Sequence, residues 1–220
     1  MSNVDLILGA DPSRKRAVRT EPTQRRSSQR LDALLDAAAE IVDESGFERL
    51  TTQMVAERAG ASIGTVYRYF PDRVAVLHAL RERSVRRFRE RLADEIARTE
   101  LETWWSVIDL SMTVGAGMYR DEPGFSVVHG GQRELAENDV EPEMAHRLTR
   151  LIEAEFGGDI DADELRFRLG VAMEVGDALI SRAFERDEEG DERYLEEARR
   201  LVHDYLAEHL GAVRTESNAA

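Results

Sequence analysis

Side chains that can pair with nucleic acid are concentrated in one short segment, residues 51–70, with the sequence TTQMVAERAGASIGTVYRYF. In its second half, Thr65, Tyr67 and Tyr69 offer hydroxyl groups. Arg68 offers a guanidinium fork, which can bind the edge of a guanine or a backbone phosphate. This combination of side chains predicts contacts with DNA rather than catalysis.

Small residues precede these polar groups. Ser62 and Gly64 would let the backbone of a helix come close to DNA, and free N–H groups at a helix start suit phosphate. Ile63 can contact the methyl group of thymine. Val66 and Phe70 are four residues apart, so we expect them to form the inward face of the same helix.

Two short helices must hold these residues in place. Thr51 or Thr52 can cap the first helix, and Ser62 can cap the second, which is expected over Ile63–Phe70. Gly60 provides the tight turn between them. This is the layout of a helix-turn-helix, in which the second helix enters the major groove.

The stretch from Leu31 to Leu80 resembles the DNA-binding domain of the TetR family of transcriptional regulators. The shared features are Glu-x-Gly-Phe at residues 44–47, then Leu-Thr-Thr, then Ala-x-x-Ala-Gly-x-Ser-x-Gly-Thr-x-Tyr-x-Tyr-Phe at residues 56–70. Ile63 stands where many relatives have a basic residue, so no base preference carries over. The resemblance implies DNA contacts from Thr51 or Thr52, Ser62, Ile63, Gly64, Thr65, Tyr67, Arg68 and Tyr69, and a phosphate contact from Arg73.

The net charge of the whole chain argues against DNA as a partner, but the distribution of charge along the chain supports it. The 220 residues include 44 acidic and 30 basic side chains, for a net charge of −14, and such acidity does not favour nucleic acid. However, residues 1–100 carry 18 basic and 16 acidic side chains, whereas residues 101–220 carry 12 and 28. We therefore expect the first hundred residues to face DNA.

A cationic segment precedes the first long helix. From Arg14 to Arg30 there are seven basic residues and one acidic residue, Glu21. The segment predicts a mobile basic arm over residues 1–22, which can follow the phosphate backbone or enter a minor groove. The alternative is a solubilising tail.

Helical periodicity continues along the rest of the chain, and no sustained alternation indicates a sheet. We predict an all-α protein with about nine helices. The expected helices beyond the helix-turn-helix are 25–45, a longer one that begins after Asp72, 101–119, 125–137, 142–156, 162–186 and 191–210. The expected domains are a helix-turn-helix domain at 23–75, a ligand-binding and dimerisation domain at 76–212, and a disordered tail at 213–220.

The last two predicted helices have apolar stripes wide enough to build a four-helix interface between two copies. The family resemblance implies the same homodimer and a small-molecule effector; the alternative for the stripes is an intrachain core. Aromatic and Met side chains line adaptable apolar pockets. The candidate pocket residues are Trp104, Trp105, Met112, Met118, Tyr119, Phe125, His129 and Met173, although ordinary core packing would use the same residue types.

Other chemistry finds no support in the sequence. Asp159, Asp161 and Asp163 imitate a calcium loop, but Glu164 and Gly170 stand where that loop needs Gly and Glu. No catalytic constellation, metal motif or cofactor motif is present, no Cys occurs, and no apolar run approaches a membrane span of about 18 residues. The sequence therefore predicts a cytoplasmic, non-enzymatic repressor that a small apolar or aromatic effector releases from a pseudo-palindromic operator. The alternative is a DNA-binding regulator under protein-partner or constitutive control.

Overall fold

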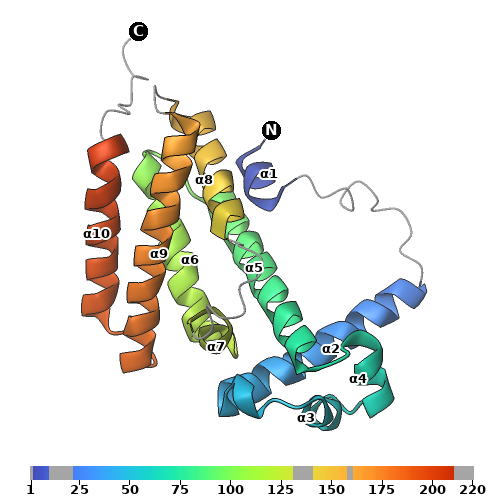
Figure 1. Cartoon of the computed structure of the whole chain (residues 1–220). Coiled ribbons are helices and arrows are strands. Elements are labelled where there is room, and N and C mark those ends of the chain that lie inside the picture. The colour runs from blue at the N-terminus through green and yellow to red at the C-terminus, as the bar shows by residue number, and fades with distance from the viewer. Residues whose placement is uncertain (1, 10–21, 131–140, 158–160, 211–220) are drawn as a thin grey trace. The chain divides into compact units, whose positions relative to one another are not determined.

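The computed structural model describes residues 2–9, 22–130, 141–157 and 161–210, with only the backbone described at 22–26, 129–130 and 141–142. Every regular element in these ranges is a helix (Figure 1), which confirms the predicted all-α class. Within the same ranges, no helix is long and apolar enough to cross a membrane.

The chain divides into two compact units. The small unit comprises residues 11–86 and 121–135, and the large unit comprises residues 1–10, 87–120 and 136–220. The domain boundaries predicted from the sequence, at residues 22/23, 75/76 and 212/213, stay a prediction, since compactness alone does not define a functional domain.

The small unit is built around one long helix. Its core takes Leu34 and Ile41, which are no more than 1% exposed, from that long helix itself, together with apolar side chains of the helices that pack on it. The long helix ends at Gly46, whose φ of +80° stops helical growth. The helices of the unit are α2 (Pro22–Ser45), α3 (Thr52–Arg58), α4 (Ile63–Tyr69), the first half of α5 (Arg73–Arg98) and α7 (Phe125–Gly130).

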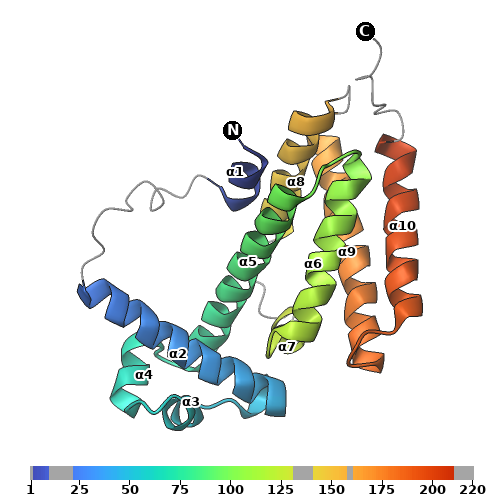
Figure 2. The same ribbon diagram turned by 180° about the vertical axis from the view of Figure 1, so that it is seen from behind.

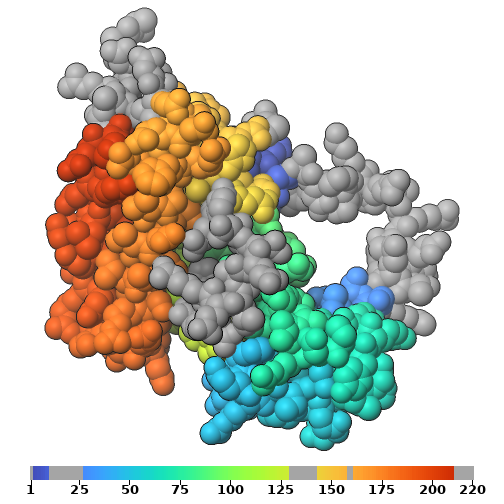
Figure 3. Space-filling model, in the orientation of Figure 1, coloured from blue at the N-terminus to red at the C-terminus, as the bar shows by residue number. Residues whose placement is uncertain are grey.

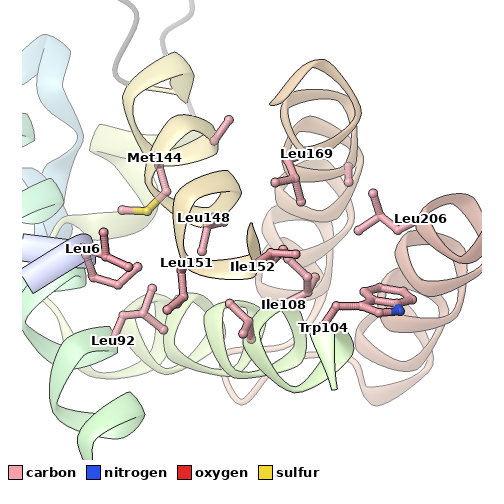
Figure 4. Packing of buried hydrophobic residues seen from close by; sticks show 14 of the residues in the cluster. Leu6, Leu92, Trp104, Ile108, Met144, Leu148, Leu151, Ile152, Leu169 and Leu206 are labelled. Carbon is pink, nitrogen blue, oxygen red and sulfur yellow. The ribbon is translucent and has the colours of Figure 1, made fainter. Parts of the chain in front are cut away.

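The large unit is a helical bundle. Its main core draws Leu92, Ile108, Leu148 and Leu169 from four different helices toward one another (Figure 4). The last two helices lie side by side along their length in both ribbon views (Figures 1 and 2). The helices of the unit are α1 (Asn3–Leu8), the second half of α5, α6 (Trp104–Asp121), α8 (Glu141–Phe156), α9 (Ala162–Arg186) and α10 (Glu192–Leu210).

Most predicted helices occur within a few residues of their expected bounds. The helix expected at 162–186 is α9, and its N-cap, Asp161, accepts hydrogen bonds from two N–H groups of the first turn. The helix expected at 125–137 is described only to Gly130, because residues 131–140 lie outside the described ranges.

The first residues contain a helix that sequence reasoning missed. Ser2 and Asp5 form a capping box for α1, and Leu6 and Ile7 are buried in the main core of the large unit. Arg147 of α8 donates hydrogen bonds to both carbonyls, at 3.1 Å for that of Ile7. The prediction of one mobile arm over residues 1–22 did not include this packed helix. The cations of the arm at residues 14–19 lie outside the described residues, and the side chains of Arg25 and Arg26 are not described either.

Candidate nucleic-acid interface

Hydrogen bonds fix both ends of α3, and so the turn that joins it to α4. The side chain of Thr51 accepts from the N–H of Met54 at 3.1 Å, which makes Thr51 the N-cap of α3. At the other end, the N–H of Ala61 donates to the carbonyl of Ala56 at 2.9 Å, and Gly60 takes a φ of +58°. This is the Schellman ending, which reverses the chain within a few residues and starts α4 at a defined angle.

One side of α4 is part of the core. Ser62 caps the helix by accepting a hydrogen bond from the N–H of Thr65 at 3.2 Å. Val66 is 0% exposed and Phe70 is 3% exposed, and both pack into the core of the small unit. The predicted inward face is therefore confirmed, and it fixes which residues of α4 face outward.

The outward side of α4 carries residues that a solvated helix does not require. Tyr67 is 55% exposed and Ile63 is 37% exposed. A Cβ added to Gly64 would meet only the Ser62 hydroxyl, at 4.0 Å, so the first turn of α4 is open to a close approach. The surface of the small unit around α3 and α4 is visible in Figure 3.

None of the ten predicted contact residues lies in the core. Their positions are compatible with contact to a duplex, and the contacts themselves stay a prediction. Exposed are Thr51, Ser62, Ile63, Gly64, Tyr67, Arg68 and Arg73, and half-buried are Thr52, Thr65 and Tyr69.

The two tyrosines of α4 have different surroundings. The Tyr67 hydroxyl accepts a long hydrogen bond of 3.5 Å from Thr52, and the residue as a whole is exposed. The Tyr69 hydroxyl lies 3.0 Å from the hydroxyl of Ser27 on α2, and the Arg68 guanidinium lies 5.3 Å from the centre of the Tyr69 ring. Tyr69 therefore links α4 to α2, whereas Tyr67 faces outward.

Arg73 begins α5 close to this surface. Its guanidinium donates to the carbonyl of Glu48 at 3.2 Å and lies 5.6 Å from the ring centre of Phe47. The neighbouring Asp72 accepts a hydrogen bond from the N–H of Ala75 at 2.8 Å. Arg73 is thus held near the start of a helix, where an anion is favoured.

Charged residues that sequence reasoning missed hold α3 in place. Arg58, at the end of α3, forms ion pairs with Glu40 at 3.2 Å and with Glu44 at 2.7 Å, both on α2. The hydrogen bond from Arg58 holds the pKa of the Glu44 carboxyl below its ordinary value. The spacing of the two glutamates, one helical turn apart, is a sequence signal for such a pair, but it does not identify the partner.

The predicted pocket residues fall into different environments. In the large unit, Trp104 and Met118 are buried, and Trp105, Met112, Tyr119 and Met173 are half-buried. Phe125 is buried too but belongs to the small unit, and the side chain of His129 is not described. The structure thus groups six of the eight residues in one unit, and their role in ligand binding stays a prediction.

Two polar side chains, His203 and Asp177, contact these aromatic residues and were not predicted to do so. His203 of α10 stacks on Trp104 with ring centres 5.7 Å apart and meets the edge of Trp105 at 5.0 Å. The Tyr119 hydroxyl donates to the carboxylate of Asp177 at 3.3 Å. Burial raises the pKa of Tyr119, and the negative charge of Asp177 raises it further.

A second unusual surface lies on α9 and α10, which form a continuous outer face of the large unit (Figure 3). Phe167 is 60% exposed, Val175 is 40% exposed and Leu201 is 37% exposed. Phe167 and Val175 are eight residues apart on α9 and so lie on the same side of the helix. Exposed large apolar side chains on two neighbouring helices indicate an interaction surface.

Comparison with known proteins matches both units to one family. The model described as bacterial regulatory proteins, tetR family, matches residues 34–80, and that of the tetracyclin repressor-like C-terminal domain matches residues 102–210. The chain is also similar to a TetR-family transcriptional regulator from Streptomyces coelicolor. That crystal structure aligns with a TM-score of 0.72 at 35% identity, over 84% of this chain and 99% of the other.

Similarity to curated relatives covers shorter stretches. The transcriptional repressor KstR of Rhodococcus jostii is 35% identical over 74 residues, which is 34% of this chain and 35% of its own length. The fatty acid metabolism regulator protein of Bacillus subtilis is 32% identical over 63 residues, or 29% of this chain and 32% of its own length. The matches therefore span about a third of each of these relatives.

Proposed function

We propose that this chain, which belongs to the tetR family of bacterial regulatory proteins, is a homodimeric DNA-binding repressor that a small apolar or aromatic effector releases from its operator. The observation that carries the DNA-binding part is the outward face of α4. That face combines exposed hydroxyls, one arginine and an open first turn at Gly64, while its opposite face is anchored in the core.

In the bound state, each copy would place α4 in a major groove. Arg68 and Tyr67 are exposed and can meet base edges or phosphates, and Ile63 can pack on a thymine methyl. Two recognition helices of one dimer read half-sites separated by one turn of DNA, about 34–36 Å. The operator should therefore be pseudo-palindromic.

The dimer would form through α9 and α10. The exposed Phe167, Val175 and Leu201 support this arrangement, because burying them against a second copy removes apolar surface from water. A two-fold interface uses the same patch on both copies. One patch is therefore enough to explain a closed dimer.

The effector is proposed from the aromatic and Met side chains of α6. The acidity of residues 101–220 disfavours a strongly anionic ligand. The effector would bind more tightly to a state of the dimer in which the spacing of the two α4 helices does not match the DNA half-sites. It would then release DNA by shifting the population toward that state. The matches to KstR and to the fatty acid metabolism regulator are too short to carry their ligands over to this chain. The alternative is control by a protein partner or constitutive repression, without a small effector.

Selection of a duplex from a random library by the full-length protein, followed by fluorescence anisotropy, tests the DNA-binding part. We expect the selected duplexes to share a pseudo-palindromic consensus sequence. In the cell, we expect the protein to be cytoplasmic and to bind genomic sites with this sequence, first of all upstream of its own gene. The double variant of Tyr67→Phe and Arg68→Ala should bind the selected duplex more weakly. Arg98→Ala, which removes an exposed arginine of α5 in the large unit, should bind it like the wild type. Full affinity of the double variant would contradict the assignment of α4.

A screen of apolar and aromatic compounds against the protein–duplex complex tests the effector. We expect at least one compound to release the duplex and to raise the melting temperature of the free protein, because it binds the folded state. Failure of every compound, combined with stable DNA binding, would favour the alternative without a small effector.

A further inference from the structure

Helix α1 is docked on the large unit, where it packs on α8. Two adjacent side chains anchor it, since Leu6 is 7% exposed and Ile7 is 0% exposed. Leu6 lies in one apolar cluster with Leu92 of α5 and Met144 of α8 (Figure 4). We name the surface formed by Leu92, Met144 and Arg147 the α1 site.

Arg147 binds the carboxyl end of α1. Its guanidinium donates to the carbonyl of Ile7 at 3.1 Å and to that of Leu6 at 3.5 Å. Carbonyls in the last turn of a helix lack partners within the helix, and a cation is favoured beside them. The Nε–H of Arg147 is buried and has no hydrogen-bond partner among the described residues, so α1 does not use every donor that the site offers.

The residue that follows α1 fits this arginine only as glycine. Gly9 has φ 79° and ψ 162°, a backbone conformation that is essentially restricted to glycine. A Cβ at that position would lie 2.7 Å from a guanidinium nitrogen of Arg147. The guanidinium is not free to move aside, because it also donates to the carboxylate of Glu143. The site therefore distinguishes glycine from other residues at this position.

Helix α1 resembles a bound peptide more than a part of the bundle. It has six residues and is too short to be stable alone, although Ser2 and Asp5 form a complete capping box. Residues 2–9 lie outside both family models, which match residues 34–80 and 102–210. Its order therefore depends on the contacts that it makes at the α1 site.

We propose that the α1 site is a peptide-binding site of which residues 2–9 are the resident ligand, and that this segment leaves and re-enters it while the rest of the large unit stays folded. The class of ligand is a short helix with the pattern of Leu6-Ile7-Leu8-Gly9: two adjacent apolar anchors, a glycine two residues after them, and last-turn carbonyls for Arg147. A free peptide of this class competes with residues 2–9. The proposal needs neither DNA nor an effector, so it does not depend on the proposed function.

The test uses the full-length chain and a free peptide with the sequence of residues 1–10, labelled at its carboxyl end. In the wild type the attached α1 competes at a roughly millimolar effective concentration. Ile7→Asp in the full-length chain vacates the site, because a carboxylate would have to be buried among apolar side chains. We expect the peptide to bind the Ile7→Asp chain at least about tenfold more tightly than the wild type, measured by fluorescence anisotropy.

Variants of the peptide and of the site test the recognition. A peptide that carries Gly9→Ala should bind the Ile7→Asp chain about tenfold more weakly, because its backbone would be strained at that residue. Adding Arg147→Ala to the Ile7→Asp chain should weaken binding of the unchanged peptide by about tenfold, because two hydrogen bonds from a charged donor are lost. Adding Arg150→Ala, which removes an exposed arginine three residues further along α8, should leave peptide binding unchanged.

Two further measurements show whether the large unit stays folded without α1. The Ile7→Asp chain should melt in one cooperative transition by circular dichroism, and the peptide should raise its melting temperature because it binds the folded state. In the wild type, where nothing is substituted, amides of residues 6–9 should exchange with solvent at least about tenfold faster than those of residues 148–152, because release of α1 is a local opening.

Three results would overturn the proposal. The first is equal protection of residues 6–9 and 148–152 in the wild type, or loss of cooperative melting in the Ile7→Asp chain, since either would make α1 an integral part of the bundle. The second is a folded Ile7→Asp chain that binds the peptide no more tightly than the wild type does. The third is peptide binding that neither Gly9→Ala nor Arg147→Ala weakens, which would be unspecific apolar adhesion.

Discussion

Helices α4 and α9 both leave side chains exposed that an ordinary solvated helix does not need, but the kinds of side chain differ. The seven-residue α4 exposes Tyr67 and Arg68, with polar atoms at their ends. The 25-residue α9 exposes Phe167 and Val175, which have none. Each helix fixes its opposite side in a core, so the difference lies in what the free side can bind.

In the proposed function, these two kinds of surface bind two kinds of partner, DNA at α4 and a second copy at α9. Hydroxyl and guanidinium groups are well solvated in water, and they form hydrogen bonds with groups of defined geometry, such as base edges and phosphates. Exposed Phe and Val side chains lower the free energy only when they are buried away from water, so they favour contact with another apolar surface. Salt should consequently weaken binding at α4 strongly and binding at α9 slightly.

The largest effect is expected from Phe167→Asp. Burial of one Phe side chain contributes about 1.5–3 kcal/mol, and the two-fold symmetry of the proposed dimer doubles each change. We expect the dimer dissociation constant to rise by more than about 100-fold, measured by analytical ultracentrifugation. DNA affinity should fall with it, since a monomer reads a single half-site.

Phe167→Leu is the matched control for this substitution. It keeps an apolar side chain at the same position and should remain dimeric at the concentrations at which Phe167→Asp is monomeric. A dimer that survives Phe167→Asp would show that the exposed face of α9 is not the interface, and the contrast with α4 would lose its meaning.

The next effect in size is expected from Arg68→Ala. Loss of an arginine that binds a base edge costs about 1–3 kcal/mol and relaxes specificity at one position of the site. Repeating the library selection with the variant measures this: the consensus should lose information at one base pair in each half-site, while the protein stays dimeric. A uniform loss of affinity with an unchanged consensus would assign Arg68 to phosphate instead.

Each residue of the predicted basic arm should contribute less to DNA affinity than Arg68, and the contribution of the arm should depend on salt concentration. Deleting residues 1–22 would also remove α1, which packs on the core of the large unit. Replacement of Arg14, Lys15, Arg16 and Arg19 by Gln is therefore the cleaner variant. For each phosphate that the arm no longer neutralises, the slope of log affinity against log salt should fall by about 0.9. An unchanged slope in the anisotropy titrations would support the alternative of a solubilising tail.

The sequence predicted the helix-turn-helix and its faces well because local rules dominate there. Ser62 as a cap, Gly60 in the turn and Val66 as an inward residue follow from hydrogen bonding and periodicity within a few residues. The same rules located α9 within its bounds, because its cap at Asp161 is also local.

Contacts between distant segments could not be predicted in this way. Helix α1 is too short to be stable alone, and it forms because Leu6 and Ile7 pack on residues far along the chain. The same limit applies to Arg83 with Asp36 and to Gly124 with Asp43, where the partners are 47 and 81 residues apart. A single sequence indicates that such residues are unusual, but it does not pair them.

The smallest effect is expected at Tyr69, and it bears most directly on what α4 exposes. The resemblance to the family implies a DNA contact from Tyr69, whereas its hydroxyl is engaged with Ser27 at 3.0 Å. Loss of one such hydrogen bond costs about 0.5–1.5 kcal/mol. If Tyr69 acts by holding α4 against α2, then Tyr69→Phe and Ser27→Ala should weaken DNA binding to a similar, modest extent. The double variant should then be no worse than either single variant, because both substitutions break the same bond. If Tyr69 contacts phosphate itself, Tyr69→Phe should weaken binding and Ser27→Ala should not. Anisotropy titrations of the three variants with the selected duplex distinguish the two cases, and the second case would add Tyr69 to the face of α4 that binds DNA.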